Sequence, residues 1–261
     1  MKSMQIRNTQ WRYEEQGSGQ AIVFVHGFPL DQRIWTEQLR GLSDRFRVIA
    51  VDLKGFGQSN SSEAFTIDSM ADELAEFIKS AATGPCVLAG LSMGGYVAIS
   101  LAMRHPQVLK SLAIVCSKAE ADTQAGKEGR QKMAELAMKE GARPVAEQML
   151  PKMFSPDTYK NRPELVEQLQ QIMEACPATT IANACFAMRD RADRTPDLPS
   201  LKMPVMVILG EKDSIIPAEM GAKIAVACKQ GAFKLIPNAG HLAPMEEPAA
   251  FNSVMAEFAK L

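Results

Sequence analysis

Hydrophobic and polar positions along this chain follow two patterns, one typical of buried strands and the other of amphipathic helices. Short apolar runs, which predict buried strands, lie at 21–25, 47–51, 86–89, 112–115, 205–209 and 233–236. Apolar residues at helical spacing predict helices at 34–42, 67–81, 92–104, 218–227 and 248–260. Because strands and helices alternate, we expect an α/β protein with a mostly parallel sheet covered by helices on both faces.

The N-terminal segment departs from this alternation. Residues 4–16 are followed by Gly17-Ser18-Gly19 and then by the apolar run at 21–25. Glycines between strand patterns favour tight turns. This order therefore predicts an antiparallel pair of strands that turns at the glycines and leads into a buried strand.

Residues 117–195 also break the alternation, because helical patterns follow one another there without a strand between them. These four patterns cover residues 126–140, 143–153, 163–174 and 179–189. An all-helical insertion is expected to cap the edge where the strands end, which is where ligands bind in α/β sheets. We therefore expect a core domain of residues 1–117 and 196–261 and a helical cap of residues 118–195.

Length and charge narrow the class of protein. A chain of 261 residues suits one α/β domain with an insertion. Its 29 basic and 30 acidic side chains give a net charge of −1, which argues against nucleic acid as a partner. The N-terminus lacks the apolar core of a signal peptide, and no apolar run approaches the roughly 20 residues that span a bilayer. We expect a cytoplasmic protein without a membrane partner, and no pattern indicates an oligomeric state.

The cysteines indicate neither disulfides nor a metal site. They are odd in number, scattered and mostly set in apolar surroundings, which is typical of reduced core thiols. Cys-x-x-Cys pairs and histidine clusters are lacking, so we expect no metal. The five are Cys86, Cys116, Cys176, Cys185 and Cys228.

The most informative motif is Gly90-Leu91-Ser92-Met93-Gly94, at the junction of a predicted strand and a predicted helix. It fits G-x-S-x-G, in which glycines on either side leave room for a sharp turn at the serine. Such a turn presents the Ser92 hydroxyl to a cleft and directs the Met93 amide at the same space. The patterns of a P-loop and of a dinucleotide site are not present, so we expect no nucleotide cofactor.

A serine hydroxyl needs a base to act as a nucleophile, and this chain has three histidines. His105 lies in Arg-His-Pro at a predicted helix end, where a structural role is the simpler interpretation. His26 opens His-Gly-Phe-Pro directly after a buried strand. His241 follows the last predicted strand in Asn-Ala-Gly-His, and it is the predicted base.

An imidazole base also needs a carboxylate that fixes its tautomer. Two acids, Glu211 and Asp213, follow the predicted strand at 205–209. We expect Asp213 to pair with His241. Glu211 remains the alternative, although it lies nearer the strand and is expected to face solvent.

With the order Ser92, Asp213, His241, the chain resembles the α/β-hydrolase family over essentially its whole length. The matching segments are residues 26–29, 52–59, 90–95, 210–213 and 239–241. The resemblance implies an α/β-hydrolase fold with a four-helix cap and a serine-dependent reaction without a cofactor. Family members that dehalogenate alkanes or open epoxides carry aspartate where this chain has Ser92, so those activities are disfavoured.

The resemblance also implies roles around the triad. The amides of Phe28 and Met93 are expected to form an oxyanion hole, in which loss of one donor can cost about 10²–10³ in rate. His26 and Gly27 are expected to shape that loop and to border the substrate. Asp52 and Ser59 are assigned by the resemblance to a supporting loop rather than to the chemistry.

Within the family, residues 90–95, the four-helix cap and the passage from 176–179 to 187–190 look similar to 3-oxoadipate enol-lactone hydrolases and related small-molecule carboxylesterases. Substrates of those lactonases carry carboxylates, for which Arg130, Arg143 and Arg189 are candidates, although a solvated surface is the simpler interpretation for each. Trp35 is expected to wall an apolar acyl pocket together with Phe28. Helical methionines belong more often to the core, but four are candidates for the pocket lining: Met133, Met149, Met153 and Met188.

We therefore expect a serine hydrolase that cleaves a small-molecule carboxylic ester or lactone through an acyl-enzyme. The same triad also fits a carbon–carbon bond hydrolase, a thioesterase or a perhydrolase that uses peroxide in place of water. A different class of function remains open, that of a ligand-binding protein on a hydrolase scaffold, because a fold alone does not fix a function.

Overall fold

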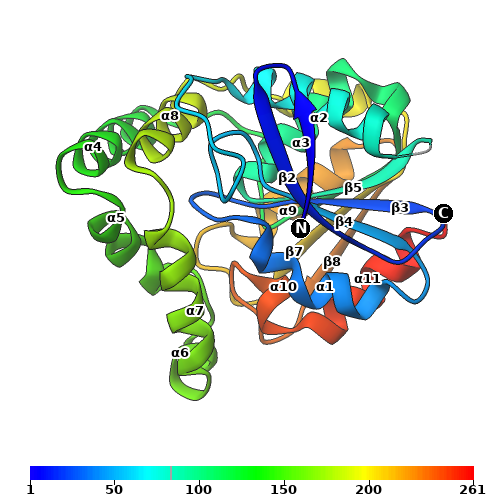
Figure 1. Ribbon diagram of the computed structural model, residues 1–261. Coiled ribbons are helices and arrows are strands. Elements are labelled where there is room, and N and C mark those ends of the chain that lie inside the picture. The colour runs from blue at the N-terminus through cyan, green and yellow to red at the C-terminus, as the bar shows by residue number, and fades with distance from the viewer. Residues whose placement is uncertain (83) are drawn as a thin grey trace.

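A single sheet runs through the centre of the protein (Figure 1). The computed structural model describes residues 1–82 and 84–261. Within them, eight strands lie in the order β1-β2-β4-β3-β5-β6-β7-β8. Their bounds are β1 (Lys2–Ile6), β2 (Thr9–Gln16), β3 (Ala21–Val25), β4 (Arg47–Val51), β5 (Cys86–Leu91), β6 (Leu109–Val115), β7 (Val205–Gly210) and β8 (Gly231–Ile236).

The sheet is mostly parallel, as the alternating pattern predicts. Strand β1 pairs antiparallel with β2, and β2 pairs antiparallel with β4. Every other neighbouring pair is parallel. The carboxyl ends of β3 to β8 therefore meet at one edge of the sheet, and the loops that carry His26, Ser92, Asp213 and His241 all leave from that edge.

The predicted turn at Gly17–Gly19 is wrong. The antiparallel pair turns between β1 and β2, at Arg7 and Asn8, where Arg7 adopts a positive φ of 49°. The glycines instead connect β2 to β3, which are not neighbours because β4 lies between them. All five residues of β3 are buried, as expected for a central strand with parallel neighbours, β4 and β5, and helices on both faces.

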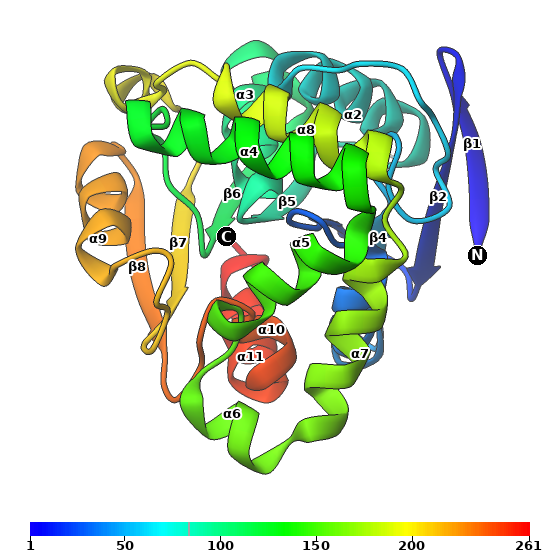
Figure 2. The ribbon, with the colours of Figure 1, turned by 90° about the vertical axis from the view of Figure 1, so that its left-hand side faces the viewer.

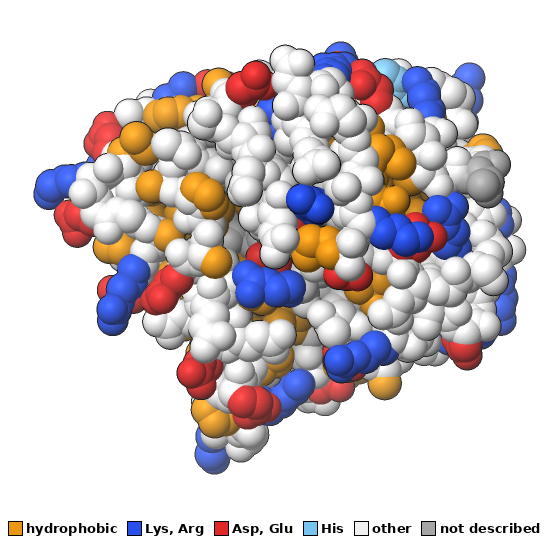
Figure 3. All heavy atoms as spheres, viewed as in Figure 1, with side chains coloured by type: hydrophobic (Ala, Val, Ile, Leu, Met, Phe, Trp, Pro, Cys, Tyr) orange, Lys and Arg blue, Asp and Glu red, His pale blue; other side chains and the backbone are white. Residues whose placement is uncertain are grey.

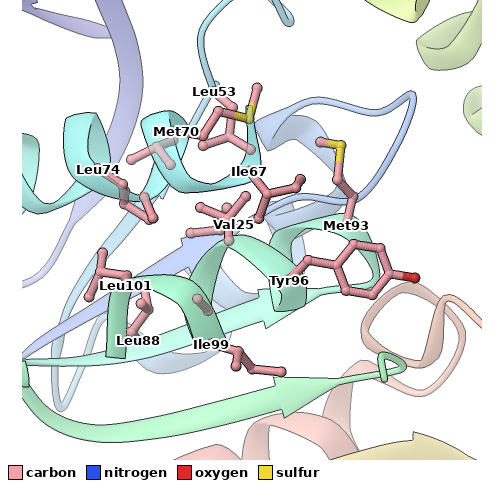
Figure 4. Close-up of a cluster of buried hydrophobic side chains, with 14 of the residues drawn as sticks. Val25, Leu53, Ile67, Met70, Leu74, Leu88, Met93, Tyr96, Ile99 and Leu101 are labelled. Carbon is pink, nitrogen blue, oxygen red and sulfur yellow. The ribbon is translucent and has the colours of Figure 1, made fainter. Parts of the chain in front are cut away.

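Alternate residues of the central strands face two separate cores. Along β3, Val23 and Val25 belong to one core and Ile22 and Phe24 to the other. Helices α2 (Ile67–Ala81), α3 (Met93–Arg104) and α9 (Ala218–Ala227) cover the first core, and α1 (Thr36–Leu42) and α11 (Pro248–Phe258) cover the second. Figure 4 shows part of the first core, where Val25 and Leu88 of the sheet meet side chains of α2 and α3.

Between β6 and β7 the chain forms helices only, in a stretch whose residues are all described. These are α4 (Gln124–Glu140), α5 (Ala142–Met149), α6 (Pro156–Asn161), α7 (Pro163–Glu174) and α8 (Ala178–Arg189). Figure 2 shows α4 and α5 crossing in front of the sheet. The four predicted helices are present, and α6 is additional. Six residues are too few to give a periodic signal, and the marks of α6 are at its start: Ser155 accepts a hydrogen bond from the Thr158 amide, and Pro156 is the first helical residue.

The end of α5 differs from the prediction for a local reason. The helix ends at Met149 rather than at residue 153, and a short 3-10 turn at Leu150–Lys152 follows. Pro151 lies in that turn, and proline cannot donate the backbone hydrogen bond that an α-helix requires. The turn redirects the chain toward α6 and brings residues 152–158 close to the loops after β7 and β8.

The surface seen in Figure 3 carries both signs of charge interspersed, which agrees with the net charge of −1. Among the described residues, no helix combines the length and apolar character that crossing a membrane requires.

Candidate active site

Ser92 occupies a strained turn between β5 and α3. Its φ of 52° and ψ of −114° lie in a region that residues with a side chain rarely adopt. The flanking glycines make the turn sterically feasible, because a Cβ on Gly90 would lie 2.2 Å from the Gly94 carbonyl oxygen and one on Gly94 would lie 2.5 Å from the carbonyl oxygens of Val25 and His26. The serine elbow is thus built from two backbone approaches that only glycine allows.

His241 and Asp213 form a buried hydrogen-bonded pair at the ends of β8 and β7. The Nδ1 atom of His241 lies 2.9 Å from Oδ2 of Asp213, and both side chains are buried. The amides of Ile215 and Ile216 donate to the other carboxylate oxygen of Asp213 at 2.8 and 3.0 Å. Burial raises the pKa of Asp213, but the charge and hydrogen bond of His241 together with the two amides outweigh burial and leave that pKa below its ordinary value.

Glu211, the alternative acid, points elsewhere. It is exposed, and its carboxylate accepts a hydrogen bond from the Asn238 amide at 3.1 Å. The chain turns directly after β7, where the Asp213 amide donates to the Gly210 carbonyl at 3.2 Å. Because of this turn the alternation of a strand no longer applies, and Asp213 reaches the buried side while Glu211 stays at the surface.

The backbone of Ser92 lies beside this pair. The Ser92 amide donates to the Val115 carbonyl at 2.9 Å, and Ser117 Oγ donates to the Ser92 carbonyl at 2.7 Å. Cys116, between those two partners, places its Sγ within 4.8 Å of a carboxylate oxygen of Asp213 and a ring nitrogen of His241. Burial raises the pKa of the Cys116 thiol well above its ordinary value, so the thiol stays protonated there.

The Ser92 hydroxyl forms no hydrogen bond with any residue that the structure describes. In enzymes without bound substrate, the bond between nucleophile and base is often long or poorly aligned and tightens only in the reacting complex. The structure therefore supplies the elbow and the histidine–carboxylate pair.

The loop after β3 is fixed by a neutral histidine. His26 is completely buried; its Nδ1 lies 2.8 Å from the Gly27 carbonyl oxygen and its Nε2 accepts the Leu53 amide at 3.1 Å. A neutral imidazole has one N–H, so these partners place the proton on Nδ1. Burial lowers the pKa of His26 to about 4. A Cβ built on Gly27 would lie 3.1 Å from Cβ of Ser92, which places this loop directly against the elbow.

Two backbone amides at this point have no acceptor among the described residues. They are those of Phe28, in the loop after β3, and Met93, the first residue of α3. An amide in the first turn of a helix has no partner within that helix, and the sharp turn at Ser92 keeps the Met93 amide beside the serine. Both donors are available to a ligand.

Residues 20–248 match the model of a protein family described as the alpha/beta hydrolase fold. The chain belongs to this family. The fold class expected from the sequence is thereby confirmed, since this hydrolase also has the eight-stranded, mostly parallel sheet described above.

Relatives of this α/β hydrolase include esterases and lactonases. The chain is 31% identical to the AB hydrolase superfamily protein YisY of Bacillus subtilis, over 94% of this chain and 93% of that protein. It is 27% identical to 3-oxoadipate enol-lactonase 1 of Acinetobacter baylyi, over 92% of this chain and 88% of that protein. The structure of a thermophilic esterase from Thermogutta terrifontis with malate bound shares 38% identity and a TM-score of 0.94, covering 97% of this chain and 93% of that one.

The loop after β4 of this hydrolase is tied to the loop after β3 and to β2 by hydrogen bonds. The Asp52 carboxylate accepts the amides of Gln32 and Gln58 at 2.8 and 2.9 Å, and Ser59 Oγ accepts the Arg12 amide at 2.7 Å. Burial raises the pKa of Asp52 to about 6, against the lowering effect of those two amides. Asp52 therefore holds the loop after β3 against the loop after β4.

The candidates for the pocket lining are placed in different surroundings. Trp35 is completely buried between Phe24 and Phe251 in the second core, which favours a packing role over a pocket wall. Met153 and Met188 are also buried, and Met149 is half-buried between the two cores. Met133 lines a hollow of about 640 Å³ along α4, which Ser92 and His241 do not line.

Among the three arginine candidates, Arg143 is the most exposed and pairs with Glu147 on its own helix. Arg189 pairs with Asp190 and lies over the Phe186 ring. Arg130 pairs with Asp122. Each of the three thus already has an acidic partner on the protein.

Sequence reasoning missed two residues that the tertiary structure places next to the predicted pair. Cys116 lies against Asp213 and His241, and Glu246 is buried and bonded to the residue before His241. A buried cysteine after an apolar strand carries no distinguishing signal. Glu246 is followed by Glu247, which is less buried, and no pattern in Met-Glu-Glu-Pro separates the two.

Proposed function

We propose that this protein is a serine hydrolase that cleaves a small carboxylic ester or lactone through an acyl-enzyme. One observation carries the proposal, the hydrogen bond between His241 Nδ1 and Asp213 Oδ2 beside the elbow of Ser92. A serine at a nucleophile elbow, with an imidazole whose second nitrogen is held by a buried carboxylate, is the arrangement that activates a hydroxyl for attack on a carbonyl.

In the first half of the reaction, Nε2 of His241 takes the proton of Ser92 as Oγ attacks the carbonyl carbon. Asp213 keeps the remaining proton of the ring on Nδ1 and stabilises the imidazolium. The amides of Phe28 and Met93 donate to the oxyanion of the tetrahedral intermediate. When that intermediate collapses, the alcohol leaves with the proton from His241, and the acyl group stays on Ser92.

In the second half, His241 takes a proton from water as the water oxygen attacks the acyl carbon. The second tetrahedral intermediate uses the same two amides. Its collapse releases the carboxylic acid and returns the proton to Ser92 Oγ. For a lactone, the alcohol and the acid are parts of one product molecule, and the same proton transfers apply.

The relatives support the class of substrate. An enol-lactonase and an esterase are among them, and both names describe hydrolysis of a carbon–oxygen bond at a carbonyl. We also propose the division into a core of residues 1–117 and 196–261 and a cap of residues 118–195. Its support is that the inserted helices contact loops at the carboxyl edge, for example through Thr180 Oγ1, which donates to the Gly55 carbonyl at 2.9 Å.

The assignment of the nucleophile is tested by Ser92→Ala. We expect loss of ester hydrolysis, because the substitution removes the nucleophile. The circular dichroism spectrum should be unchanged, because the Ser92 hydroxyl forms no hydrogen bond with a described residue. A fluorophosphonate probe should label the wild-type protein and not this variant. Ser80→Ala, at an exposed serine of α2, is the matched control and should keep both activity and labelling. Turnover retained by Ser92→Ala would contradict the proposal.

The chemical class of the substrate is tested separately, by comparing kcat/KM over p-nitrophenyl esters, lactones, acyl thioesters and vinylogous diketones. We expect the esters or lactones to give the highest values. A higher kcat/KM for thioesters or for diketones would show that the same triad cleaves a carbon–sulfur or a carbon–carbon bond instead of an ester bond.

A further inference from the structure

A second buried carboxylate lies next to the proposed base and has no part in the steps above. Glu246, at the end of α10 (Ala243–Glu246), is 4% exposed. Its Oε1 accepts the Gly240 amide at 2.7 Å, and its Oε2 accepts the Ser155 amide and the Thr158 hydroxyl, each at 2.7 Å. Among the described residues, no lysine, arginine or histidine forms an ion pair with this carboxylate.

The three donors come from two separate parts of the chain. Gly240 directly precedes His241, whereas Ser155 and Thr158 begin α6 in the helical insertion (Figure 2). The Glu246 carboxylate therefore joins the histidine loop to the insertion in the interior of the protein. Three hydrogen bonds of 2.7 Å from both parts of the chain converge on this one side chain, which restrains Gly240 relative to the start of α6.

Two further contacts fix the same loop. The Leu242 amide, on the other side of His241, donates to the Met153 carbonyl at 3.1 Å. A Cβ on Gly240 would lie 2.5 Å from the Ser155 nitrogen, so the two backbones touch. His241 is thus held on both sides by the segment that precedes α6.

The loop that carries Asp213 also contacts residues 152–157, but through exposed side chains. Lys212 pairs with Asp157 at 2.6 Å, and Ser214 Oγ donates to the Lys152 carbonyl at 3.3 Å. Exposed ion pairs contribute little, because water screens them. Arg162 of the insertion also donates to the Glu246 carbonyl at 2.9 Å, in a partly buried position. Among the described residues, the hydrogen bonds of the Glu246 carboxylate are more deeply buried than these links.

We propose that Glu246 is a positioning residue for His241. It holds the imidazole in line with Ser92 and Asp213 by fixing Gly240 against the start of α6. The proposal rests on the proposed function, because it takes His241 to be the base. A shift of about 1 Å in a catalytic group can cost on the order of 10²-fold in rate, so loss of this link lowers the rate of the chemical step.

The test is Glu246→Gln, which keeps the shape of the side chain and replaces an acceptor oxygen by an NH₂ group that faces an N–H or O–H donor. We expect kcat to fall by about 10- to 100-fold, with KM changed by about twofold or less. The matched control is Glu247→Gln, the same substitution at the next residue, whose carboxylate forms no hydrogen bond or ion pair with the described residues. Its kcat should stay within about twofold of wild type.

A second readout does not depend on catalysis. The proton on Nδ1 of His241, in the 2.9 Å bond to Asp213, should give a proton NMR resonance downfield of the amides that is missing in His241→Ala. We expect this resonance to shift or broaden in Glu246→Gln and to be unchanged in Glu247→Gln. A merely structural role would change the melting temperature and leave the resonance of the folded protein in place.

The two proposals fail in different ways. A wild-type protein that hydrolyses neither esters nor lactones and resists the fluorophosphonate probe would overturn the proposed function. The NMR comparison alone would then decide whether Glu246 positions His241. An unchanged resonance in Glu246→Gln, or a kcat equal to that of Glu247→Gln, would overturn the positioning role. If Glu246→Gln does not fold, Glu246→Asp replaces it, with the same outcomes expected, because its carboxylate is one methylene shorter and cannot reach both segments.

Discussion

At the scale of single residues, burial decides the charge state of His26. Its pKa is about 4 rather than the usual 6.5 because the ring is completely buried. Both ring nitrogens have the partners that suit a neutral imidazole with its proton on Nδ1. The residue therefore acts as a fixed hydrogen-bonding unit between the loops after β3 and β4, with no charge to offer near neutral pH.

The first prediction at this scale concerns the titration of that ring. The NMR resonances of His26 should remain those of the neutral form from pH 8 down to about pH 5, with a midpoint near 4, because protonation places an uncompensated charge in the core. His105, which is partly exposed and lies 2.6 Å from Asp72, is the internal comparison for the assignment. A midpoint near 6.5 for His26 would contradict the prediction.

The same shift has a consequence for stability. Below pH 6.5 His26 is protonated in the unfolded chain but stays neutral in the folded protein. The contribution of His26 to stability is therefore fully present above pH 6.5 and is lost as pH falls toward 4. The full loss corresponds to about 3 kcal/mol. Asp52 contributes to stability with the opposite pH dependence, because its pKa is raised to about 6. Its contribution is fully present below the ordinary pKa of 3.8 and is lost as pH rises through 6. The two groups partly cancel between pH 4 and 6.

At the scale of elements, the serine elbow shows how a strand, a turn and a helix depend on glycine. Gly90 and Gly94 allow backbone approaches that a Cβ would block, and Gly94 lies against the carbonyl oxygens that lead into the loop of Phe28. The elbow and the loop after β3 therefore form one packed unit. A change at either glycine moves both the serine and the nearby amide donors.

The second prediction follows from that contact. Gly94→Ala should lower the free energy of unfolding by about 1–3 kcal/mol, because its Cβ meets backbone atoms that cannot give way. It should also reduce kcat by pushing the loop of Phe28 out of place. Gly129→Ala, in α4, is the control. Its Cβ meets no atom within 4 Å, and alanine should stabilise the helix by up to about 1 kcal/mol.

Urea denaturation and ester hydrolysis measure both effects. Equal stability of the two glycine variants would show that the backbone at the elbow can relax around a methyl group, contrary to the packing argument.

Elements with a long periodic pattern were predictable from the sequence, and short ones were not. The 15 residues of α2 carry a regular apolar face, and their predicted bounds match the structure. The 3-10 turn at Leu150–Lys152 and the four-residue α10 have no periodic signal, yet both contribute to the surroundings of His241. The strand pairing was also not predictable, because nothing in the residues of β2 indicates that β4 lies between β2 and β3.

At the scale of the whole molecule, buried Arg191 joins the inserted helices to the rest of the protein. Its guanidinium donates to the Met188 and Glu120 carbonyls, both at 2.7 Å, and to Asp122 at 2.8 Å. It also lies 4.1 Å from the centre of the Tyr96 ring on α3. One side chain therefore connects the end of α8, the segment before α4 and the helix that follows Ser92.

The third prediction is that Arg191→Lys lowers the free energy of unfolding by about 2–3 kcal/mol, since a lysine keeps the charge but cannot supply the planar fork that serves three acceptors. Arg143→Lys, at a side chain that is 74% exposed, is the matched control and should change stability by less than about 0.5 kcal/mol. Chemical denaturation of both variants gives the comparison. Equal values would show that the contacts of Arg191 are replaceable.

The sequence by itself determined the fold class, the elbow at Ser92, and the choice of Asp213 and His241 as candidates. It did so because apolar periodicity, glycine spacing and the succession of strands and motifs along the chain can be read without knowing how the strands pair. Only the tertiary structure decided which side chains meet: that Asp213 rather than Glu211 reaches His241, that Trp35 packs in the core, and that Glu246 ties His241 to the insertion. Those contacts join residues far apart in the chain, and whether a carboxylate is buried against them depends on how the separate elements pack.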